Sequence, residues 1–408
     1  MKVLQVNCNG YYGSTGKIVR KLSTYLTETG NENIIACSGY REKSSDEKTY
    51  CLSGNLTVRA NQAASYLCGD AGFRFGFTTQ KLIRLIREQK PDLVQLHHLE
   101  SYFINVERLA NFLKREKIPT VWTMHDCWPF TGHCTHFFTV GCEKWKTGCF
   151  DCPQKKEFPY SLFLDRSRAL YEKKKTAFSD WEDLHLVNVS NWMQEMVRQS
   201  FLGGKEMRVI YNGVDPEVFY PSGKAEERKK ELGLSGKFVI LSVASTWSEK
   251  KGWDTFKQLA KELDSDAKIV LVGVSEKQAP ELPDGILWIP KVRSADVLRE
   301  YYSMADVYLN LSLEETFGLV SVEAMACGTP VIACATTANP EIAAPKCGVV
   351  LRKRGMEQIL DALSVVRQKG KGFYSKACVD RVKTRFSEKA MCEGYYAYYR
   401  QILERGKS

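Results

Sequence analysis

The sequence predicts an α/β protein with two Rossmann-like, doubly wound domains. Its 408 residues exceed what one hydrophobic core usually supports. Short apolar segments alternate with amphipathic segments of helix length, and this alternation restarts after about residue 205. With 44% hydrophobic and 26% charged residues, the composition is that of an ordinary globular protein. Each domain can therefore bury a core of its own.

The predicted strands are short apolar runs, which are typical of parallel strands buried on both faces. The first half of the chain contains five of them, at 2–6, 34–37, 92–96, 120–124 and 184–189. The second half contains five more, at 238–243, 268–273, 286–289, 307–311 and 330–333.

The boundary between the domains is predicted near residue 205. Shortly after it, segment 212–221 combines a turn-forming Asn-Gly pair with two prolines. At the end of the chain, aromatic side chains recur at helical spacing, which predicts a helix that packs back across the first domain. The expected parts are 1–204 with a cysteine-rich insertion at 127–153, then 205–387, then the terminal helix at 388–408.

The formal net charge of +10 indicates a phosphate-rich partner, such as a nucleotide, a lipid phosphate or an anionic bilayer. Solvated helix faces are the alternative explanation of the basic residues. No apolar run approaches the roughly 20 residues that span a bilayer, and the amino terminus lacks the apolar segment of a signal peptide. We therefore expect a cytoplasmic protein, with peripheral contact to the inner membrane left open.

The most informative segment, 312–333, predicts a strand end, a loop and a helix that starts near Phe317. Glu315 and Glu323 lie eight positions apart, just over two helical turns, so both carboxylates can face one ligand. Amides at the start of a helix lack intrahelical acceptors and suit a phosphate group. A capping glutamate and a solvated carboxylate face are the structural alternatives. The amides concerned belong to Phe317, Gly318 and Leu319.

A second segment, 242–254, predicts a strand end, a loop with two lysines and a glycine that opens a helix. A loop of this kind can clamp phosphates through Lys250 and Lys251. A pair of surface lysines without a ligand is the alternative.

A glycine-rich loop at 9–17 follows the first predicted strand and leads into a helix predicted over 18–26. Gly13 and Gly16 therefore lie where a diphosphate could meet a helix N-terminus. The segment is not a P-loop, because its outer glycines are one residue too far apart and no hydroxyl residue follows Lys17.

His125 and Asp126 follow the predicted strand 120–124, at the carboxyl edge where open α/β sheets bind ligands. Two further polar residues stand at similar points: Ser190 after a strand and before a helix, and Asn212 in the Asn-Gly turn. Helix capping and turn formation explain these two equally well.

Segment 312–333 closely resembles the Glu-x7-Glu signature of the retaining glycosyltransferase family 4. That family has the GT-B fold, in which two Rossmann-like domains face each other across a cleft. The resemblance implies that Glu315 contacts the donor sugar and that Glu323 binds the ribose hydroxyls. It also implies that the amides of 317–319 contact the diphosphate.

The resemblance extends to the other motifs. Lys251 matches the family's diphosphate-binding lysine, and Lys250 would substitute for an arginine that this sequence lacks, since Thr246 and Trp247 stand in its place. The family's His-Asp pair implies that His125 lies near the donor sugar and the reaction centre. The family also implies that the loop at 9–17, Ser190 and Asn212 face the region between the domains.

From 65 to 218 the sequence is similar to a capsular or colanic-acid subgroup of the family. This implies retaining transfer from a UDP- or GDP-sugar to a hydroxyl of a lipid-linked or polysaccharide acceptor, without a metal ion in catalysis. One alternative is a nucleotide-sugar epimerase of the same architecture. Another is a zinc-stabilised nucleic-acid-binding protein, but aromatic residues do not interleave with basic ones, so no nucleic acid partner is expected.

Four cysteines fall within nineteen residues and end in a Cys-x2-Cys pair. Four thiolates can complete a tetrahedral structural zinc site, and the insertion is expected to lack the apolar residues for a core of its own. Free thiols and disulfides are the alternatives, although disulfides are rare in the cytosol. A catalytic role is not expected. The cysteines are Cys134, Cys142, Cys149 and Cys152, with Cys127, His133 and His136 nearby.

Overall fold

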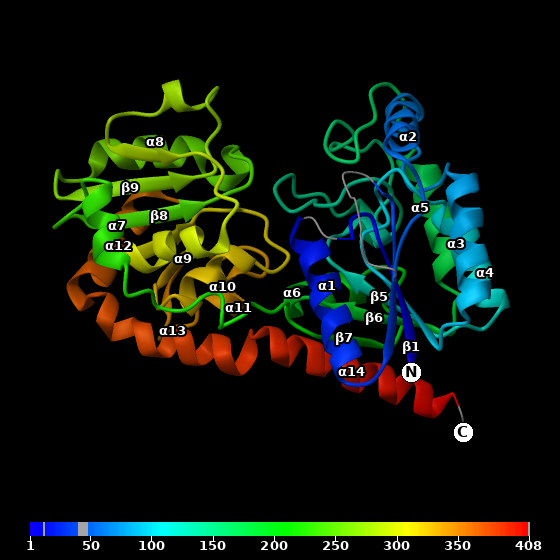
Figure 1. Ribbon diagram of the computed structural model, residues 1–408. Coiled ribbons are helices and arrows are strands. Elements are labelled where there is room, and N and C mark those ends of the chain that lie inside the picture. The colour runs from blue at the N-terminus through cyan, green and yellow to red at the C-terminus, as the bar shows by residue number, and fades with distance from the viewer. Residues whose placement is uncertain (11–12, 40–47, 407–408) are drawn as a thin grey trace. The chain divides into compact units, whose positions relative to one another are not determined.

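The computed structural model describes residues 1–10, 13–39 and 48–406 and divides the chain into two compact units (Figure 1). Unit 1 comprises Met1–Ile210 and Cys392–Ser408, and unit 2 comprises Tyr211–Met391. The division falls a few residues beyond the predicted 204. It does so because the unpredicted strand β7 (Met207–Val209) pairs with β6 (Leu184–Asn188) and extends the first sheet.

The described part of unit 1 contains a seven-stranded parallel sheet with the order β3-β2-β1-β4-β5-β6-β7. Its central strands are buried along their whole length, as expected of a sheet covered on both faces. Between β1 and β4 the strand order reverses direction, which makes this pair the topological switch point. The remaining strands are β1 (Lys2–Asn7), β2 (Glu32–Cys37), β3 (Thr49–Cys51), β4 (Leu93–Leu96) and β5 (Thr120–Met124).

The helices of unit 1 bury one apolar stripe each. In α4 (Val106–Arg115), Val106, Leu109, Ala110 and Leu113 are buried at the spacing of one helix face, and the Asn105 side chain caps the helix by accepting from the Arg108 amide over 3.0 Å. The other helices are α1 (Gly13–Glu28), α2 (Asn55–Cys68), α3 (Gly76–Gln89), α5 (Ser167–Phe178) and α6 (Asn191–Arg198), and two 3-10 turns lie at Trp128–Phe130 and Lys144–Lys146.

The last helix, α14 (Glu388–Arg405), begins in unit 2 and continues along unit 1. Its buried tyrosines reach the sheet: the Tyr399 hydroxyl donates to Gln95 Oε1 over 2.8 Å, and the hydroxyls of Tyr395 and Thr123 lie 2.9 Å apart. Near its end, Arg405 forms an ion pair with Glu206 at 2.9 Å. The tyrosines repeat at helical spacing because they cover one strip of the first core.

The described residues of unit 2 form a six-stranded parallel sheet with the order β10-β9-β8-β11-β12-β13. Right-handed crossovers place α8 (Trp253–Glu262) on one face and α9 (Ala295–Met304) and α10 (Leu319–Ala326) on the other (Figure 1). The switch point lies between β8 and β11. The strands are β8 (Phe238–Val243), β9 (Ala267–Val272), β10 (Ile286–Ile289), β11 (Val307–Asn310), β12 (Val331–Cys334) and β13 (Gly348–Leu351); the other helices are α7 (Ala225–Glu231), α11 (Asn339–Ile342), α12 (Met356–Lys369) and α13 (Lys371–Arg385).

The two doubly wound sheets confirm the predicted fold class. Strands β3, β7 and β13 were not predicted because they have only three or four residues and are partly exposed, so the apolar signal is weak. Within the described residues, no helix is both long and apolar enough to cross a membrane.

The contact of α14 with unit 1 gives the first testable prediction. Because Gln95 and Tyr399 are both fully buried, Tyr399→Phe should leave a buried carbonyl oxygen unpaired and cost about 1–3 kcal/mol of unfolding free energy. The measurement is the urea dependence of amide exchange in β4. Tyr396→Phe is the matched control, since this half-buried ring makes an edge contact with Tyr25. Equal stability of the two variants would contradict the prediction.

Candidate active site

The switch point of unit 2 brings Lys251 and Glu315 together. Lys251 follows β8 and Glu315 follows β11, and these neighbouring strands end at the same edge of the sheet. The Lys251 ammonium lies 2.5 Å from Glu315 Oε1 and also donates to Ser312 Oγ over 3.1 Å. The lysine and the first glutamate of the predicted donor site are therefore direct partners in the structure.

The loop that carries Glu315 is held on both sides by backbone contacts. The Glu315 amide donates to Thr337 Oγ1 over 2.9 Å, and its carbonyl accepts from the Ala338 amide over 3.1 Å. On the other side, the Leu313 amide donates to the Lys250 carbonyl over 3.0 Å. The Glu315 backbone is thus positioned by the loop after β12 and by the lysine loop as well as by its own strand.

Lys250 does not join Lys251 in one clamp. Its ammonium lies 3.5 Å from Glu314 Oε2, so the two neighbouring lysines pair with two neighbouring glutamates. Trp247, which stands where the family has an arginine, is buried and donates through Nε1 to the Val272 carbonyl over 3.1 Å. An arginine from elsewhere in the sequence, Arg354, donates to the Glu249 carbonyl over 2.7 Å and pairs with its carboxylate.

The helix after Glu315 begins two residues later than predicted. Gly318 is the N-cap of α10 and Leu319 its first residue. Gly318 has a φ of +96°, a left-handed conformation that favours glycine, and a Cβ there would find no neighbour closer than 3.8 Å. Phe317 is buried and its ring lies 5.7 Å from that of Phe386, so its side chain serves the core.

Glu323 lies on α10, where its Oε2 accepts a hydrogen bond from the Tyr302 hydroxyl over 2.8 Å. Burial, reinforced by the Glu323 charge, raises the pKa of Tyr302 well above its ordinary value, so the phenol remains a donor. Tyr302 was not predicted, because it lies on another helix, α9, and no motif marks it. Its role is to orient the second glutamate of the pair.

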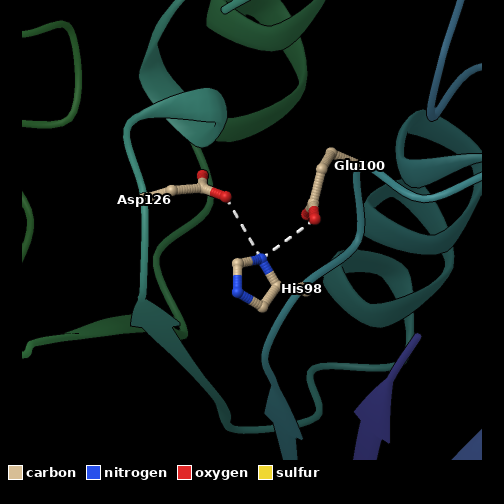
Figure 2. Close-up of side chains that lie close together, drawn as sticks. All are labelled: His98, Glu100 and Asp126. Atoms are coloured by element: carbon tan, nitrogen blue, oxygen red, sulfur yellow. Dashed lines mark ion pairs between the residues drawn. The ribbon is translucent and has the colours of Figure 1, made fainter. Parts of the chain in front are cut away.

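In unit 1, polar side chains gather after β4 and β5, next to the switch point. His98 follows β4 and is held at the backbone by β1, because its amide donates to Asn7 Oδ1 over 3.2 Å. Its Nδ1 lies 3.0 Å from Glu100 Oε1 and 3.1 Å from Asp126 Oδ2 (Figure 2). The second Asp126 oxygen accepts from the Trp128 amide over 2.9 Å. One imidazole therefore bridges two buried carboxylates.

The protonation of this triad follows from its contacts. Burial opposes a charge on His98, but Glu100 and Asp126 outweigh it and raise the pKa of His98 well above 6.5. Burial likewise opposes a charge on Asp126, and His98 outweighs it and lowers the pKa of Asp126. Among the described residues, these three form the one set of histidine, cysteine or carboxylate ligands whose atoms all lie within 4.8 Å of one another.

His125 lies beside this triad in a chain of hydrogen bonds with a defined direction. Gln5 donates its amide to Val19 O over 3.0 Å and to Asn33 Oδ1 over 3.1 Å, so its Oε1 faces His97 Nε2 at 3.1 Å as an acceptor. His97 Nδ1 is then unprotonated and accepts from His125 Nε2 over 3.1 Å. The ring of His125 is left with Nδ1 as its acceptor.

Both of these histidines are neutral. Burial, followed by the charge of His98, lowers the pKa of His97 to about 3. Burial and then His98 lower the pKa of His125 well below 6.5. The rings of His97 and His98 both stack against that of His125, at centroid distances of 5.4 and 5.2 Å.

The remaining predicted ligand residues either have structural roles or lie next to residues outside the described part of the chain. Helix α1 begins at Gly13, not at residue 18, so Gly13 and Gly16 lie in its first turn; the intervening part of the predicted loop, residues 11–12, lies outside the described residues. Ser190 caps α6 by accepting from the Met193 amide over 3.1 Å. Asn212 is buried, and its Oδ1 has no hydrogen-bond partner among the described residues.

The cysteine-rich insertion has more of a core than expected. Phe137 stacks on Trp145 at 4.6 Å, and Phe130 meets Trp145 edge-on at 5.4 Å. This corrects the expectation that the insertion lacks apolar residues, because the aromatic rings are spread along the sequence and meet only in the fold. All four cysteines are free thiols. The zinc site remains a prediction.

Two parallel, doubly wound sheets are the architecture of the GT-B fold, and solved structures agree. Sucrose-phosphate synthase from Thermosynechococcus elongatus is similar with a TM-score of 0.70 over 99% of both chains at 16% identity. Anabaena Alr3699/HepE, solved in complex with UDP-glucose, has a TM-score of 0.65 over 100% of this chain and 99% of its own, also at 16% identity. At such identities the likeness shows the fold.

The chain belongs to glycosyltransferase family 4. The family profile "Glycosyltransferase Family 4" matches residues 15–218, and "Glycosyl transferases group 1" matches residues 223–370. The N-acetyl-alpha-D-glucosaminyl L-malate synthase of Bacillus anthracis is 31% identical over 351 residues, covering 83% of this chain and 80% of that protein. The putative colanic acid biosynthesis glycosyl transferase WcaC of Escherichia coli K12 is 24% identical over 336 residues, covering 80% and 81%. The predicted enzyme class is confirmed, and the nucleic-acid-binding alternative is not favoured.

The bridged imidazole of His98 gives the second prediction. Its pKa is raised, so its contribution to stability is complete below pH 6.5 and is lost as the pH rises through the raised value. The pKa of Asp126 is lowered. The contribution of Asp126 to stability is therefore present above pH 3.8 and is lost as the pH falls through the lowered pKa. In 15N NMR of the imidazoles, His98 should remain protonated above pH 6.5 while His97 and His125 remain neutral.

Asp126→Asn removes one of the two carboxylates and should shift the His98 titration to lower pH. His185, which lies outside this cluster and pairs with Glu206, serves as the internal control and should titrate unchanged. A His98 that titrates at or below 6.5 in the unmodified protein would contradict the assignment.

Proposed function

We propose that this glycosyltransferase moves a sugar from a UDP- or GDP-sugar to an acceptor hydroxyl with retention of anomeric configuration. The observation that carries the proposal is the contact of Lys251 with Glu315. Glu315 comes shortly before the N-terminus of α10, the helix that carries Glu323. An ammonium, helix amides and two carboxylates at one sheet edge supply partners for a diphosphate, a sugar and a ribose.

The diphosphate is the charged part of the donor. Lys251 is only about one-third exposed, at 35%, so its charge is less screened than that of a surface lysine. The amides at the start of α10 add partial positive charge. As the bond from sugar to phosphate breaks, these groups stabilise the growing charge on the departing diphosphate by preorganised electrostatics, so we propose catalysis without a metal ion.

The two glutamates bind the uncharged parts of the donor. Glu315 accepts hydrogen bonds from sugar hydroxyls, and Glu323, oriented by Tyr302, accepts from the ribose. HepE, whose structure includes UDP-glucose, supports a nucleotide-sugar donor for this fold. No residue is assigned as a covalent nucleophile.

The acceptor is assigned to unit 1. His125, which the family resemblance places near the donor sugar and the reaction centre, offers a neutral nitrogen acceptor, and this suits a sugar hydroxyl better than a phosphate. The similarity to WcaC, which is named for colanic acid biosynthesis, favours a lipid-linked or polysaccharide acceptor in a capsule or exopolysaccharide pathway. The Bacillus anthracis relative is named for transfer to malate, so the family also uses small acceptors. The epimerase alternative is less favoured, because relatives such as WcaC are named as glycosyl transferases.

The third prediction tests donor binding in EDTA with a panel of UDP-, GDP- and ADP-sugars. Lys251→Ala should weaken binding by about 1.5–3 kcal/mol, which is roughly tenfold to a hundredfold, because a charged hydrogen bond is lost. Glu323→Ala should weaken the affinity for the free nucleotide as well, because it removes the ribose contact. Binding is measured by calorimetry, and slow donor hydrolysis by NMR of the released sugar.

The matched controls are Lys257→Ala, which removes an ammonium paired with Asp254 on α8, and Glu357→Ala on the exposed face of α12. Both should bind the donor normally. Released sugar of inverted configuration would contradict the retaining mechanism. Failure to bind any nucleotide sugar would overturn the donor assignment.

Unit 1 also presents a surface that suits a bilayer, and we include peripheral contact with the inner membrane in the proposal. Leu162, Phe163 and Leu164 are consecutive and 54%, 70% and 45% exposed. This apolar segment lies against the end of α2, because the Leu162 amide donates to the Tyr66 carbonyl over 2.8 Å. Exposed basic side chains flank it, which favours an anionic lipid surface. They belong to Lys156, Arg166 and Arg168.

The fourth prediction is that the protein co-floats with vesicles containing phosphatidylglycerol and that added salt weakens this binding. Phe163→Ser should reduce partitioning at least about tenfold, because burial of such a side chain is worth about 1.5–3 kcal/mol. Phe373→Ser is the control, since Phe373 is 63% exposed on α13 in unit 2. Equal partitioning of the two variants, or no binding to the vesicles, would contradict the membrane contact.

A further inference from the structure

Two cysteines lie side by side at the edge of the sheet of unit 1 where β3 is the outermost strand. Cys37 is the last residue of β2 and Cys51 is the last residue of β3, and the parallel pairing of these strands makes the two residues register partners. Their Sγ atoms lie 3.8 Å apart, although the residues are 14 positions apart in the sequence. The fold therefore brings two thiols into contact.

The backbone around the two cysteines suits a disulfide bond. Register partners on neighbouring strands direct their side chains to the same face of the sheet. Neighbouring parallel strands lie about 4.8 Å apart, and a disulfide spans roughly 4.4–6.8 Å between Cα atoms. Closing the gap between the sulfur atoms thus requires rotation of the side chains but no change of strand partner.

The two thiols differ in their access to solvent. Cys37 is fully buried, whereas Cys51 is exposed. A small molecule in solution can reach the sulfur of Cys51, but it cannot reach that of Cys37. This arrangement offers one thiol for reaction with a reagent in solution and a second thiol behind it that can displace the reagent.

The strand that carries Cys51 is short. β3 has three residues, and two backbone hydrogen bonds join its flanks to β2. The Ile35 amide donates to the Lys48 carbonyl over 3.0 Å, and the Leu52 amide donates to the Cys37 carbonyl over 2.8 Å. A short edge strand opens at a lower free energy than the centre of a sheet. A covalent bond to β2 therefore has a measurable effect on this strand.

The end of β2 also holds the start of the glycine-rich loop at 9–17. Ser38, which follows Cys37, donates its amide and its hydroxyl to the Cys8 carbonyl over 3.3 and 2.7 Å. Cys8 follows β1 and directly precedes the loop. The Ser53 hydroxyl donates in turn to the Ser38 carbonyl, so the chain after β3 is tied to the same residue. Both cysteines thus stand next to segments that meet at Ser38.

We propose that Cys37 and Cys51 are a redox modification site, at which a reversible disulfide fastens β3 to β2 beside the glycine-rich loop. The reagent is a low-molecular-weight disulfide such as oxidised glutathione. The Cys51 thiolate attacks one sulfur of this disulfide and releases one small thiol, and the Cys37 thiolate then attacks Cys51 Sγ and releases the second. Two protein thiols and one small disulfide become one protein disulfide and two small thiols, which take up the two protons.

The exposure of Cys51 keeps the bond reversible. Exposed disulfides exchange readily with small thiols, whereas buried ones resist reduction. In a reducing compartment, protein disulfides are typically transient and serve catalysis or redox sensing. The bond therefore forms under oxidising conditions and is removed when reduced small thiols are restored.

The experiment equilibrates the full-length protein in glutathione buffers that range from fully reduced to mostly oxidised. After an acid quench the remaining thiols are alkylated, and mass spectrometry of the digest identifies linked peptides. We expect peptides joined through Cys37 and Cys51 in the oxidised buffers, and their separation when reduced glutathione is restored. Cys68→Ser is the matched control, because Cys68 is a half-buried thiol on α2 and its loss should leave the link unchanged.

Variants of the pair identify the order of the two steps. Cys51→Ser changes an exposed side chain and should show no linked peptides. Cys37→Ser should leave Cys51 as a lasting mixed disulfide with glutathione. If Cys37→Ser does not fold, the unmodified protein decides, because its Cys51 should carry glutathione only transiently. A lasting mixed disulfide there, a link to a different cysteine, or no Cys37–Cys51 link in any buffer would overturn the proposal.

Hydrogen exchange tests what the bond does to the sheet. The amides of residues 49–52 should exchange at least about tenfold more slowly in the oxidised protein, because the cross-link restricts the open form of this edge. Exchange in β5 should be the same in both forms. Equal exchange at 49–52 would contradict the fastening of β3. None of these measurements uses a donor or an acceptor, so their outcome is independent of the transferase proposal.

Discussion

Both candidate sites depend on the parallel direction of the strands. A sheet buried on both faces leaves no room for charged side chains along its strands, so they collect in the loops beyond the carboxyl ends. Two neighbouring strands then supply the partners: β8 and β11, at the switch point of unit 2, for Lys251 and Glu315, and β4 and β5, next to the switch point of unit 1, for His98 and Asp126. The geometry of each site is therefore set by the packing of apolar strands that touch no ligand.

The charge of His98 controls the two histidines beside it. A buried imidazolium held by two carboxylates disfavours a second positive charge nearby, so His97 and His125 remain neutral. Gln5 Oε1 accepts from His97 Nε2 and so fixes the direction of the hydrogen bonds. His125 therefore donates its Nε2 proton to His97 Nδ1. His125 is thus limited to accepting a hydrogen bond at Nδ1. A histidine that binds a phosphate donates a hydrogen bond to it, whereas His125 can only accept one at Nδ1. This favours a hydroxyl group as its ligand.

The sequence predicted the fold class and the motif-bearing strands, because their apolar runs are long and their motifs contiguous. It singled out Glu315, Lys251 and His125 as candidate site residues through local patterns and a family resemblance, and their roles remain predictions. It missed Tyr302, Arg354 and Gln5, which reach the sites from distant parts of the chain, and single-sequence patterns do not report such pairs. His98 comes shortly after the predicted strand 92–96, but its role depends on Glu100 and Asp126 meeting it in space. The aromatic core of the insertion was missed for the same reason.

In the proposed donor site, the contact of Lys251 with Glu315 also explains how one site can hold both a charged and an uncharged part of a donor. The pair is partly exposed, with side chains 35% and 16% accessible, and such pairs contribute only about 0–1 kcal/mol. A diphosphate carries more charge than one carboxylate, so it can displace Glu315 from Lys251 at little cost. The displaced carboxylate keeps its backbone anchors at Thr337 and Ala338. It is then free to accept hydrogen bonds from a sugar hydroxyl, so that binding of the phosphate prepares the binding of the sugar.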